Sequence, residues 1–169
     1  MSPLIVDAAN GVGAVAMEKL LVHLGSKDIS IKTVNTDIQS AEKLNHDVCY
    51  IKVKTHTQCG ADYVKINQKK PLGLDITPGQ RCASLDGDAD RIVFYFQNNQ
   101  GTFKLLDGDK IATLAAGFIM KLVQEARVMF EDGSPIRVGL VQTAYANGSS
   151  TSYVKEELVR SCDLIFIFF

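Results

Sequence analysis

The sequence predicts an α/β fold with a mixed, mostly parallel sheet, flanking helices and a metal-loop β-hairpin. The first 35 residues read as strand, helix and strand, and this order is typical of a parallel βαβ unit. Two further β-rich runs flank an acidic loop at 86–91, and a third run follows after a turn.

The amino-terminal elements follow from the hydrophobic pattern. A buried strand is expected over 4–6, followed by a glycine-containing turn over 7–13. Apolar residues then recur at i, i+3, i+4 and i+7 and predict the buried face of a helix that ends near Gly25: Met17, Leu20, Leu21 and Leu24. Alternation predicts a second strand over 29–34, and a short helix is expected over 61–67.

Order returns in the second half of the chain. Strands are expected over 82–85, 92–96 and 102–106, and a turn at 98–101 joins the last two. The clearest helix follows, with an apolar stripe of Ile111, Leu114, Ala115, Phe118, Leu122 and Val123. We interpret Asp107 and Asp109 as its capping residues. A strand over 136–141 and a helix over 151–159 complete the pattern.

Charge and composition exclude some classes of protein. Lys and Arg total 18 against 19 Asp and Glu, for a net charge of −1, so no nucleic-acid partner is expected. Apolar runs are too short to cross a bilayer, so no membrane partner is expected. Because the four scattered cysteines favour reduced thiols and no secretory leader is evident, we expect a cytoplasmic protein.

Three carboxylates in the acidic loop point to a metal. Asp86, Asp88 and Asp90 alternate with small residues between two apolar strands, where their mutual repulsion favours a bound cation. Mg²⁺ prefers such oxygen ligands, and we predict that these three aspartates hold it. The alternative is an acidic loop that faces water. A calcium EF-hand is excluded, because Arg91 stands where that loop needs glycine.

Other patterns leave alternatives open. Arg91, beside the acidic loop, could support a phosphate or simply pair with one of the aspartates. Gly11 and Gly13 follow the shape of a dinucleotide-binding turn, but a tight strand-to-helix turn explains them without NAD. Cys49, His56 and Cys59 offer zinc ligands without a clear fourth.

These motifs together resemble the α-D-phosphohexomutase superfamily, and the expected fold is that of a phosphohexomutase domain. The stretch 6–13 is similar to the opening strand and turn of that family's second domain, and 86–91 is similar to its magnesium loop. The stretches 106–114 and 141–151 resemble its acetylglucosamine branch. The resemblance implies a four-domain enzyme in which a phosphoserine of the first domain exchanges a phosphoryl group with N-acetylglucosamine 6- and 1-phosphates. These reactions lie on the route to UDP-N-acetylglucosamine.

The resemblance also implies which parts are present. It assigns 1–160 to the second domain, which supplies Mg²⁺ ligands Asp86, Asp88 and Asp90, with Arg91 near the serine phosphate. We therefore expect a fragment without the phosphoserine or the third and fourth domains, inactive alone because those domains complete the cleft for the sugar phosphate. The segment 47–58 interrupts the pattern and 161–169 does not continue it, so we hypothesise that both are translated non-coding sequence or another error in the definition of the gene. The alternative function is a non-catalytic α/β module that binds a divalent metal or a partner.

Overall fold

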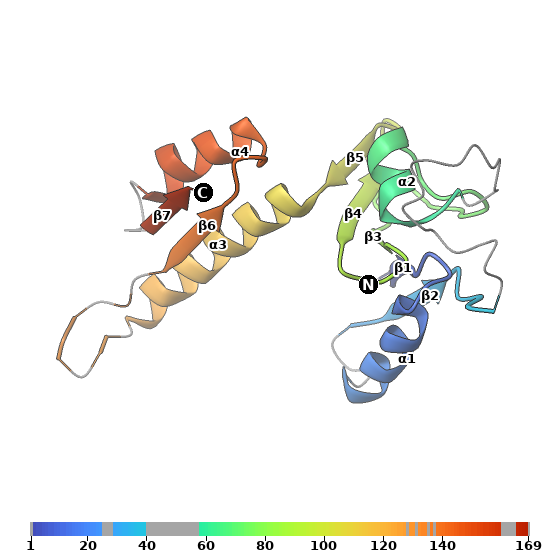
Figure 1. Cartoon of the computed structure of the whole chain (residues 1–169), viewed down its shortest axis with the longest axis horizontal. Coiled ribbons are helices and arrows are strands. Elements are labelled where there is room, and N and C mark those ends of the chain that lie inside the picture. The colour runs from blue at the N-terminus through green and yellow to red at the C-terminus, as the bar shows by residue number, and fades with distance from the viewer. Residues whose placement is uncertain are drawn as a thin grey trace. The chain divides into compact units, whose positions relative to one another are not determined.

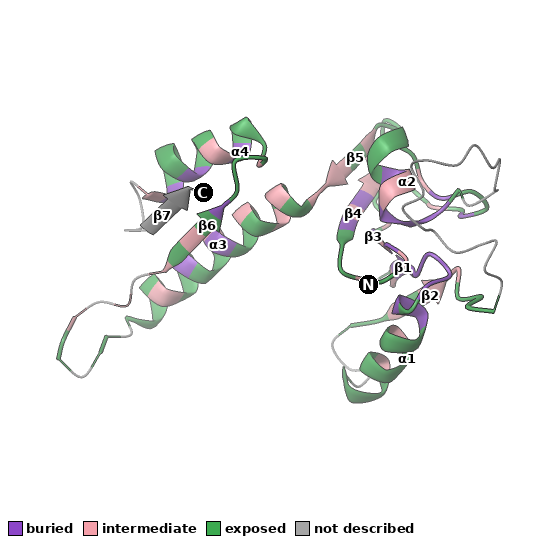
Figure 2. Cartoon of the chain, viewed as in Figure 1, coloured by how far each residue is buried: buried purple, intermediate pink, exposed green. Residues whose placement is uncertain are grey.

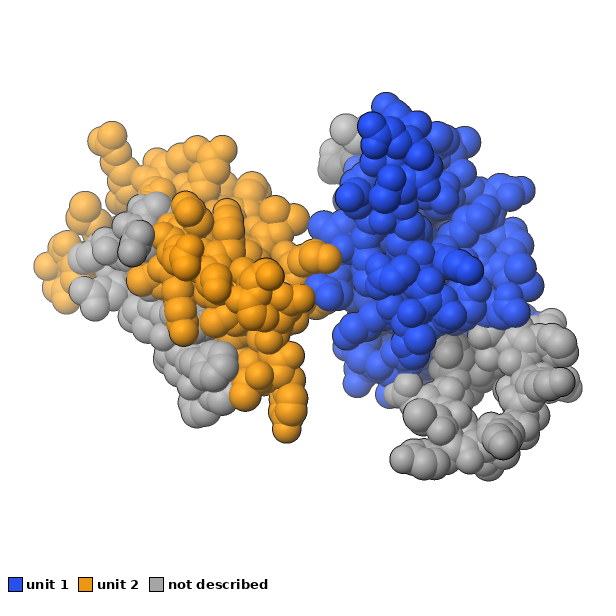
Figure 3. Space-filling model, turned by 90° about the horizontal axis from the view of Figure 1, so that it is seen from above, with its two compact units in different colours: residues 1–107 blue, residues 108–169 orange. Residues whose placement is uncertain are grey.

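The structure of the chain is a computed structural model. It describes residues 2–24, 29–39, 58–127, 129–130, 132–134, 136 and 138–159, together with the backbone of 165–168. The chain divides into two compact units, Met1–Asp107 and Gly108–Phe169 (Figure 3). This boundary falls inside the range 1–160 that the family resemblance assigns to the second domain. The physical reason is that each unit has a hydrophobic core of its own.

The first unit is built on a five-stranded mixed sheet of order β2-β1-β3-β4-β5 (Figure 1). Its strands are β1 (Leu4–Asp7), β2 (Ile31–Val34), β3 (Cys82–Leu85), β4 (Ile92–Gln97) and β5 (Phe103–Leu106). β1 pairs in parallel with both β2 and β3, whereas the β3–β4 and β4–β5 pairs are antiparallel. The predicted α/β class is therefore confirmed. The acidic loop joins the antiparallel pair β3 and β4.

Two helices flank this sheet, and they are buried to different extents. Helix α2 (Gly60–Asn67) buries Ala61 and Val64 in a core that also contains Ile5, Cys82, Val93 and Tyr95. Helix α1 (Gly13–Leu24) buries only its first residues, Gly13 and Ala14. The predicted helix is present, but its apolar face is only partly covered: Met17 and Leu21 are half-buried, whereas Leu20 is 45% exposed and Leu24 49% (Figure 2).

The second unit contains helix α3 (Gly108–Ala126), strand β6 (Gly139–Gln142), helix α4 (Gly148–Tyr153), the π-helical turn η2 (Val154–Leu158) and strand β7 (Ile165–Phe168). Strands β6 and β7 form a parallel pair. Part of the range 161–169, which does not continue the family pattern, is thus strand β7. The core of this unit consists of Ala116, Met120, Val154 and Leu158.

The predicted apolar stripe of α3 is not its buried face. Leu114 and Phe118 are 66% and 60% exposed, whereas Ala116 and Met120 are buried (Figure 2). Small residues explain the difference, because they let η2 approach the helix closely: a Cβ added at Gly117 would lie 3.5 Å from Cδ2 of Leu158. Periodicity finds the helix correctly but selects the wrong side of it.

Some expectations lie outside the described residues. These are Gly25 as a helix stop, Cys49 and His56 as zinc ligands, and most of the segment 47–58. Its last residue, Gln58, is described, and its carbonyl accepts a hydrogen bond from the backbone N–H of Leu72 at 2.8 Å. Within the described parts of the chain, no helix combines the length and hydrophobicity that a membrane crossing requires.

Candidate metal centre

The acidic loop brings three carboxylates together at the carboxyl end of β3. One oxygen from each of Asp86, Asp88 and Asp90 can be chosen so that all three lie within 4.8 Å of one another. Asp86 is 1% exposed, whereas Asp88 and Asp90 are exposed. All three predicted ligands therefore converge, with one at the base of the loop and two at its surface. Three carboxylate oxygens at this spacing fit a hard cation that prefers oxygen ligands, such as Mg²⁺.

Hydrogen bonds to Asp86 define the shape of the loop. The Arg91 backbone N–H donates to Oδ1 of Asp86 at 3.2 Å, and the Ala89 N–H donates to the Asp86 carbonyl at 3.3 Å. Ala89 has a φ of 61°, in the left-handed region, where a small side chain limits the steric cost. The small spacer residues thus allow the chain to turn tightly between its aspartates.

The first glycine turn packs directly against this loop. A Cβ added at Gly11 would lie 2.1 Å from the carbonyl oxygen of Gly87, and one added at Gly13 would lie 2.6 Å from Cδ1 of Leu85. The Val12 backbone N–H donates to that Gly87 carbonyl at 3.0 Å. Close packing against the loop backbone therefore accounts for Gly11, and Gly13 packs against a side chain of the loop's first strand, as expected for a tight strand-to-helix turn. No dinucleotide is needed to explain them.

Arg91 is held between two carboxylates that come from different elements. Its Nε donates to Oδ2 of Asp86 at 2.7 Å. Its two terminal nitrogens donate to the two carboxylate oxygens of Asp62, in the first turn of α2, at 2.6 and 3.1 Å. Asp90 is farther away, with Oδ1 at 3.4 Å from Nε. The pairing with an aspartate that the sequence left open is present, and Asp62 is a partner that sequence patterns did not indicate.

The charges in this cluster shift the pKa of its members in different directions. Burial acts to raise the pKa of Asp86, but hydrogen bonds from Arg91 and Asp90 and the charge of Arg91 outweigh it, so the pKa is lowered. The pKa of Asp90 is raised, first by its hydrogen bond with Asp86 and then by the charge of Asp88. Desolvation acts to lower the pKa of Arg91, but Asp62 and Asp86 raise it overall. Arg91 therefore remains a cation at any physiological pH.

Asp7 is a second residue that sequence patterns did not single out. Its carboxylate is fully buried, at 0% exposure, and accepts four hydrogen bonds. Oδ1 accepts from the Ala9 backbone at 3.0 Å and from Nδ2 of Asn35 at 2.8 Å. Oδ2 accepts from the Gly60 backbone at 2.7 Å and from Oγ of Ser84 at 2.8 Å. A lone aspartate at the end of an apolar strand was the one available signal.

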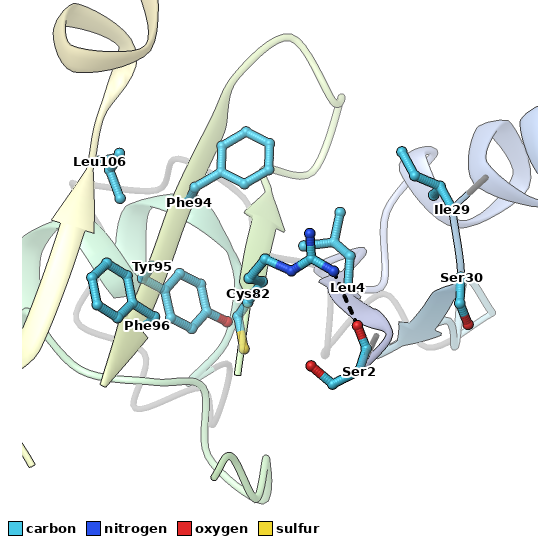
Figure 4. Close-up of a pocket in the computed structure, with 10 residues that line it drawn as sticks. Ser2, Leu4, Ile29, Ser30, Cys82, Phe94, Tyr95, Phe96 and Leu106 are labelled. Carbon is cyan, nitrogen blue, oxygen red and sulfur yellow. Dashed lines mark hydrogen bonds between the residues drawn. The ribbon is translucent and has the colours of Figure 1, made fainter. Parts of the chain in front are cut away.

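Two cavities of the first unit lie at different places on the sheet. One, of about 680 Å³, adjoins the acidic loop and is lined in part by Asn10, Lys19 and Asp88. The other, of about 250 Å³, is lined mainly by apolar side chains that include Leu4, Phe94 and Phe96 (Figure 4). It lies at the amino ends of β1 and β3, whereas the acidic loop comes after the carboxyl end of β3. The first cavity is therefore the one that belongs to the candidate centre.

Of the two residues predicted to cap α3, Asp109 contacts a different segment of the chain. Oδ2 of Asp109 accepts a hydrogen bond from the Asn147 backbone N–H at 2.8 Å, so this side chain links two segments of the chain. Asp109 still lies in the first turn of α3, where its charge suits the helix dipole. Asn147 caps α4, because its Oδ1 accepts from the Ser149 N–H at 2.9 Å.

Protein-family models match both units. The model "Phosphoacetylglucosamine mutase AMG1, domain II" matches residues 1–93, and the model for domain III of the same enzyme matches residues 107–164. The second match corrects the expectation that nothing of the third domain is present. It also reaches four residues into the range 161–169.

Individual proteins give the same result. The phosphoacetylglucosamine mutase of Homo sapiens is 45% identical over 151 residues, which are 89% of this chain and 24% of that protein. That of Candida albicans is 46% identical over 153 residues, or 90% of this chain and 26% of that protein. The chain thus spans about a quarter of the length of the curated relatives it matches.

Solved structures share the fold. The N-acetylphosphoglucosamine mutase of Aspergillus fumigatus, in complex with GlcNAc-6P and magnesium, is 42% identical, with a TM-score of 0.80 over 99% of this chain and 28% of that one. An apo-form N-acetylglucosamine-phosphate mutase, a member of the alpha-D-phosphohexomutase superfamily, is 40% identical with a TM-score of 0.80; the match covers 99% of this chain and 32% of that one. These matches, which agree with the convergence of the loop aspartates, show that the chain belongs to the phosphoacetylglucosamine mutase family of the α-D-phosphohexomutase superfamily.

Proposed function

We propose that this chain is part of an enzyme that interconverts N-acetylglucosamine 6-phosphate and N-acetylglucosamine 1-phosphate, and that Asp86, Asp88 and Asp90 hold its Mg²⁺. The observation that carries the proposal is the convergence of three carboxylate oxygens within 4.8 Å. The fungal relative that binds GlcNAc-6P and magnesium, at 42% identity, supports the choice of metal and substrate.

The donor set suits Mg²⁺ in charge and in access. Asp86 is buried at the base of the loop, and Asp88 and Asp90 are exposed at its surface. These three residues would hold Mg²⁺, and the exposed side of the loop would stay open to water and to a phosphate oxygen. Bound Mg²⁺ supplies positive charge that neutralises a phosphoryl group during its transfer.

The residues around the loop would bind and orient the phosphate. Arg91 presents a planar guanidinium beside Asp86, and such a group suits the oxygens of a phosphate. The adjoining cavity of about 680 Å³ provides space for a ligand next to Asp88. Lys19 lines the same cavity and adds positive charge at its border. The family resemblance assigns the phosphoserine to the first domain, which the two matched family models do not include.

Because the proposed metal ligands lie in this chain and the phosphoserine is assigned to the first domain, we expect the chain alone to bind Mg²⁺ without turning over substrate. We expect calorimetric titration with Mg²⁺ to show one site, and Asp88→Asn and Asp90→Asn each to weaken it at least tenfold. Asp75→Asn is the matched control, because Asp75 is a fully exposed carboxylate that pairs with Lys70. Clear isomerisation of N-acetylglucosamine 6-phosphate by the chain alone would contradict the proposal. A folded chain that binds no Mg²⁺ would also contradict it.

We also propose a cytoplasmic location. Cys59 and Cys82 are free thiols, and such thiols are typical of a reducing compartment. Fractionation of cells that express the tagged chain tests the proposal, and recovery from a secretory compartment would overturn it.

A further inference from the structure

We propose that Asp62 is a positioning residue for Arg91. By holding the Arg91 guanidinium, Asp62 keeps it from competing with the metal for the acidic loop. The inference rests on the proposed Mg²⁺ site and deepens it. It assigns a role to a carboxylate to which the resemblance gave none and that lies 24 positions before the first loop aspartate in the sequence.

The first step concerns competition for one carboxylate. Nε of Arg91 lies 2.7 Å from Oδ2 of Asp86 and 3.4 Å from Oδ1 of Asp90. Arg91 is therefore a cation that already contacts two of the three proposed metal ligands. A guanidinium that turned its other donors toward these oxygens would neutralise the charge that attracts Mg²⁺. A site of this kind needs something that limits how far the guanidinium can move.

Asp62 supplies that limit. Both of its carboxylate oxygens accept hydrogen bonds from the terminal nitrogens of Arg91, at 2.6 and 3.1 Å. A bidentate pair of this type fixes the plane of the guanidinium as well as its position. With the terminal nitrogens engaged in this way, it is Nε that donates to the Asp86 carboxylate. If a metal ion binds Asp86, Arg91 still keeps its two hydrogen bonds to Asp62. These bonds hold the guanidinium in place, so it does not move with the Asp86 carboxylate.

The helix that carries Asp62 is itself fixed relative to the loop. Asp62 lies in the first turn of α2, where the helix dipole favours a negative charge. The Gly60 N–H at the start of this helix donates to buried Asp7 at 2.7 Å. Ala61 and Val64 pack in the core of the first unit. Asp62 is thus mounted on a rigid element, as a group that positions another side chain must be.

A double-mutant cycle on the full chain tests this role, with binding of Mg²⁺ alone as the readout. We expect Asp62→Asn to weaken Mg²⁺ binding about tenfold, a typical cost of losing a partner outside the ligand set. We expect the same substitution in an Arg91→Met background to change Mg²⁺ affinity less than about twofold, because the competing cation is gone. Asp62→Glu should recover most of the affinity, because it restores a bidentate carboxylate.

The outcomes separate the two proposals. If Asp62→Asn weakens Mg²⁺ binding equally with Arg91 or Met at position 91, Asp62 acts only by its charge, and the positioning role is wrong. If the single variant binds Mg²⁺ as tightly as the unaltered chain, the role is also wrong. If the unaltered chain is folded and binds no Mg²⁺, the metal site itself fails, and this inference fails with it.

Folding is checked by thermal unfolding of every variant, with Asp75→Asn as the charge-matched control. Should Asp62→Asn fail to fold, Arg91→Lys replaces it, because lysine cannot form the bidentate pair with Asp62. The inference then predicts weaker Mg²⁺ binding by Arg91→Lys, which Asp62→Glu does not change further. Unchanged Mg²⁺ binding by Arg91→Lys would overturn it.

Discussion

The backbone N–H of Val12 donates a hydrogen bond to the carbonyl of Gly87 at 3.0 Å, and this bond joins the first glycine turn to the acidic loop. The two segments are 75 residues apart in the sequence. They meet because β1 and β3 are parallel neighbours, so the segments after the two strands emerge at the same edge of the sheet. The turn after β1 is therefore a support for the candidate metal loop.

Gly11→Ala should disturb the metal loop. The added Cβ would lie 2.1 Å from the Gly87 carbonyl oxygen, so one of the two backbones must move. We expect a loss of about 1–3 kcal/mol in the free energy of unfolding, as for other overpacked sites, and weaker binding of Mg²⁺. Denaturant titration and calorimetry measure the two effects.

Gly108→Ala is the control for that substitution, because an added Cβ there meets no atom within 4 Å. It should leave Mg²⁺ binding unchanged. Equal effects of the two substitutions on Mg²⁺ affinity would show that the contact between Val12 and Gly87 does not support the loop.

Asp7→Asn should destabilise the first unit. The buried carboxylate accepts four hydrogen bonds, two of them from the Gly60 backbone and the Ser84 hydroxyl through Oδ2. An amide group at Oδ2 would place a donor against these donors. Because a hydrogen bond to a charged group contributes about 1.5–3 kcal/mol, we expect a loss of at least that size. Asp75→Asn should stay within about 0.5 kcal/mol in the same denaturant titration. Similar losses for both variants would refute the role of Asp7.

The sequence predicts the order of the elements well because hydrophobic periodicity reports local structure. The helix α2, expected over 61–67, spans Gly60–Asn67. The three aspartates could be recognised because like charges at such short spacing call for a cation. Asp62 could not be recognised: it reaches Arg91 across 29 positions, and only the packing of α2 on the sheet brings the two together.

The side of a helix that is buried is also hard to predict. In α3 the larger apolar residues, such as Leu114 and Phe118, outnumber the small residues of the buried face and dominate the pattern. Burial is decided by how closely another element can approach, and small residues allow the closest approach. The two-unit division has a similar origin, because a boundary at Asp107 appears only once the two cores are distinguished.

The thiols of Cys59 and Cys82 should be unreactive near neutral pH. Burial is the main cause that raises the pKa of Cys82 to about 11 and that of Cys59 to about 12. Relative to an ordinary thiol, the reactive thiolate of Cys82 is therefore about 100-fold less populated at pH 8. Alkylation at pH 8, followed by peptide mass spectrometry, should label both residues at least about 100-fold more slowly in the native chain than in denaturant. Rapid labelling of the native chain would contradict their burial.

The same raised pKa values make stability depend on alkaline pH. The folded state keeps both thiols protonated, whereas unfolded thiols ionise near pH 9. The unfolded state therefore binds fewer protons above pH 9, and stability falls as pH rises from about 9 through the folded pKa values, about 11 for Cys82 and about 12 for Cys59. Below about pH 8 this contribution is fully present. The midpoint temperatures of thermal unfolding at pH 8 and pH 10 measure this loss of stability. Cys82→Ala should reduce the difference between these two midpoints. A difference that is unchanged by this substitution would assign the pH dependence to other groups.

Met120→Ala should destabilise the second unit more than Phe118→Ala does, although phenylalanine is the larger side chain. Met120 is 2% exposed in the core of the second unit, and its truncation should cost about 2–5 kcal/mol. Phe118 is larger but 60% exposed, so its truncation should cost less than about 0.5 kcal/mol. Hydrogen exchange of peptides from α3 measures the stability of this unit separately from the first. A larger loss of protection from hydrogen exchange in Phe118→Ala than in Met120→Ala would mean that the predicted stripe, and not the face with Ala116 and Met120, is buried in solution. Leu158 of η2 packs in one core with Ala116 and Met120, and a Cβ added at Gly117 would lie 3.5 Å from its Cδ2. The face of α3 that η2 covers is therefore the one that carries Ala116, Gly117 and Met120.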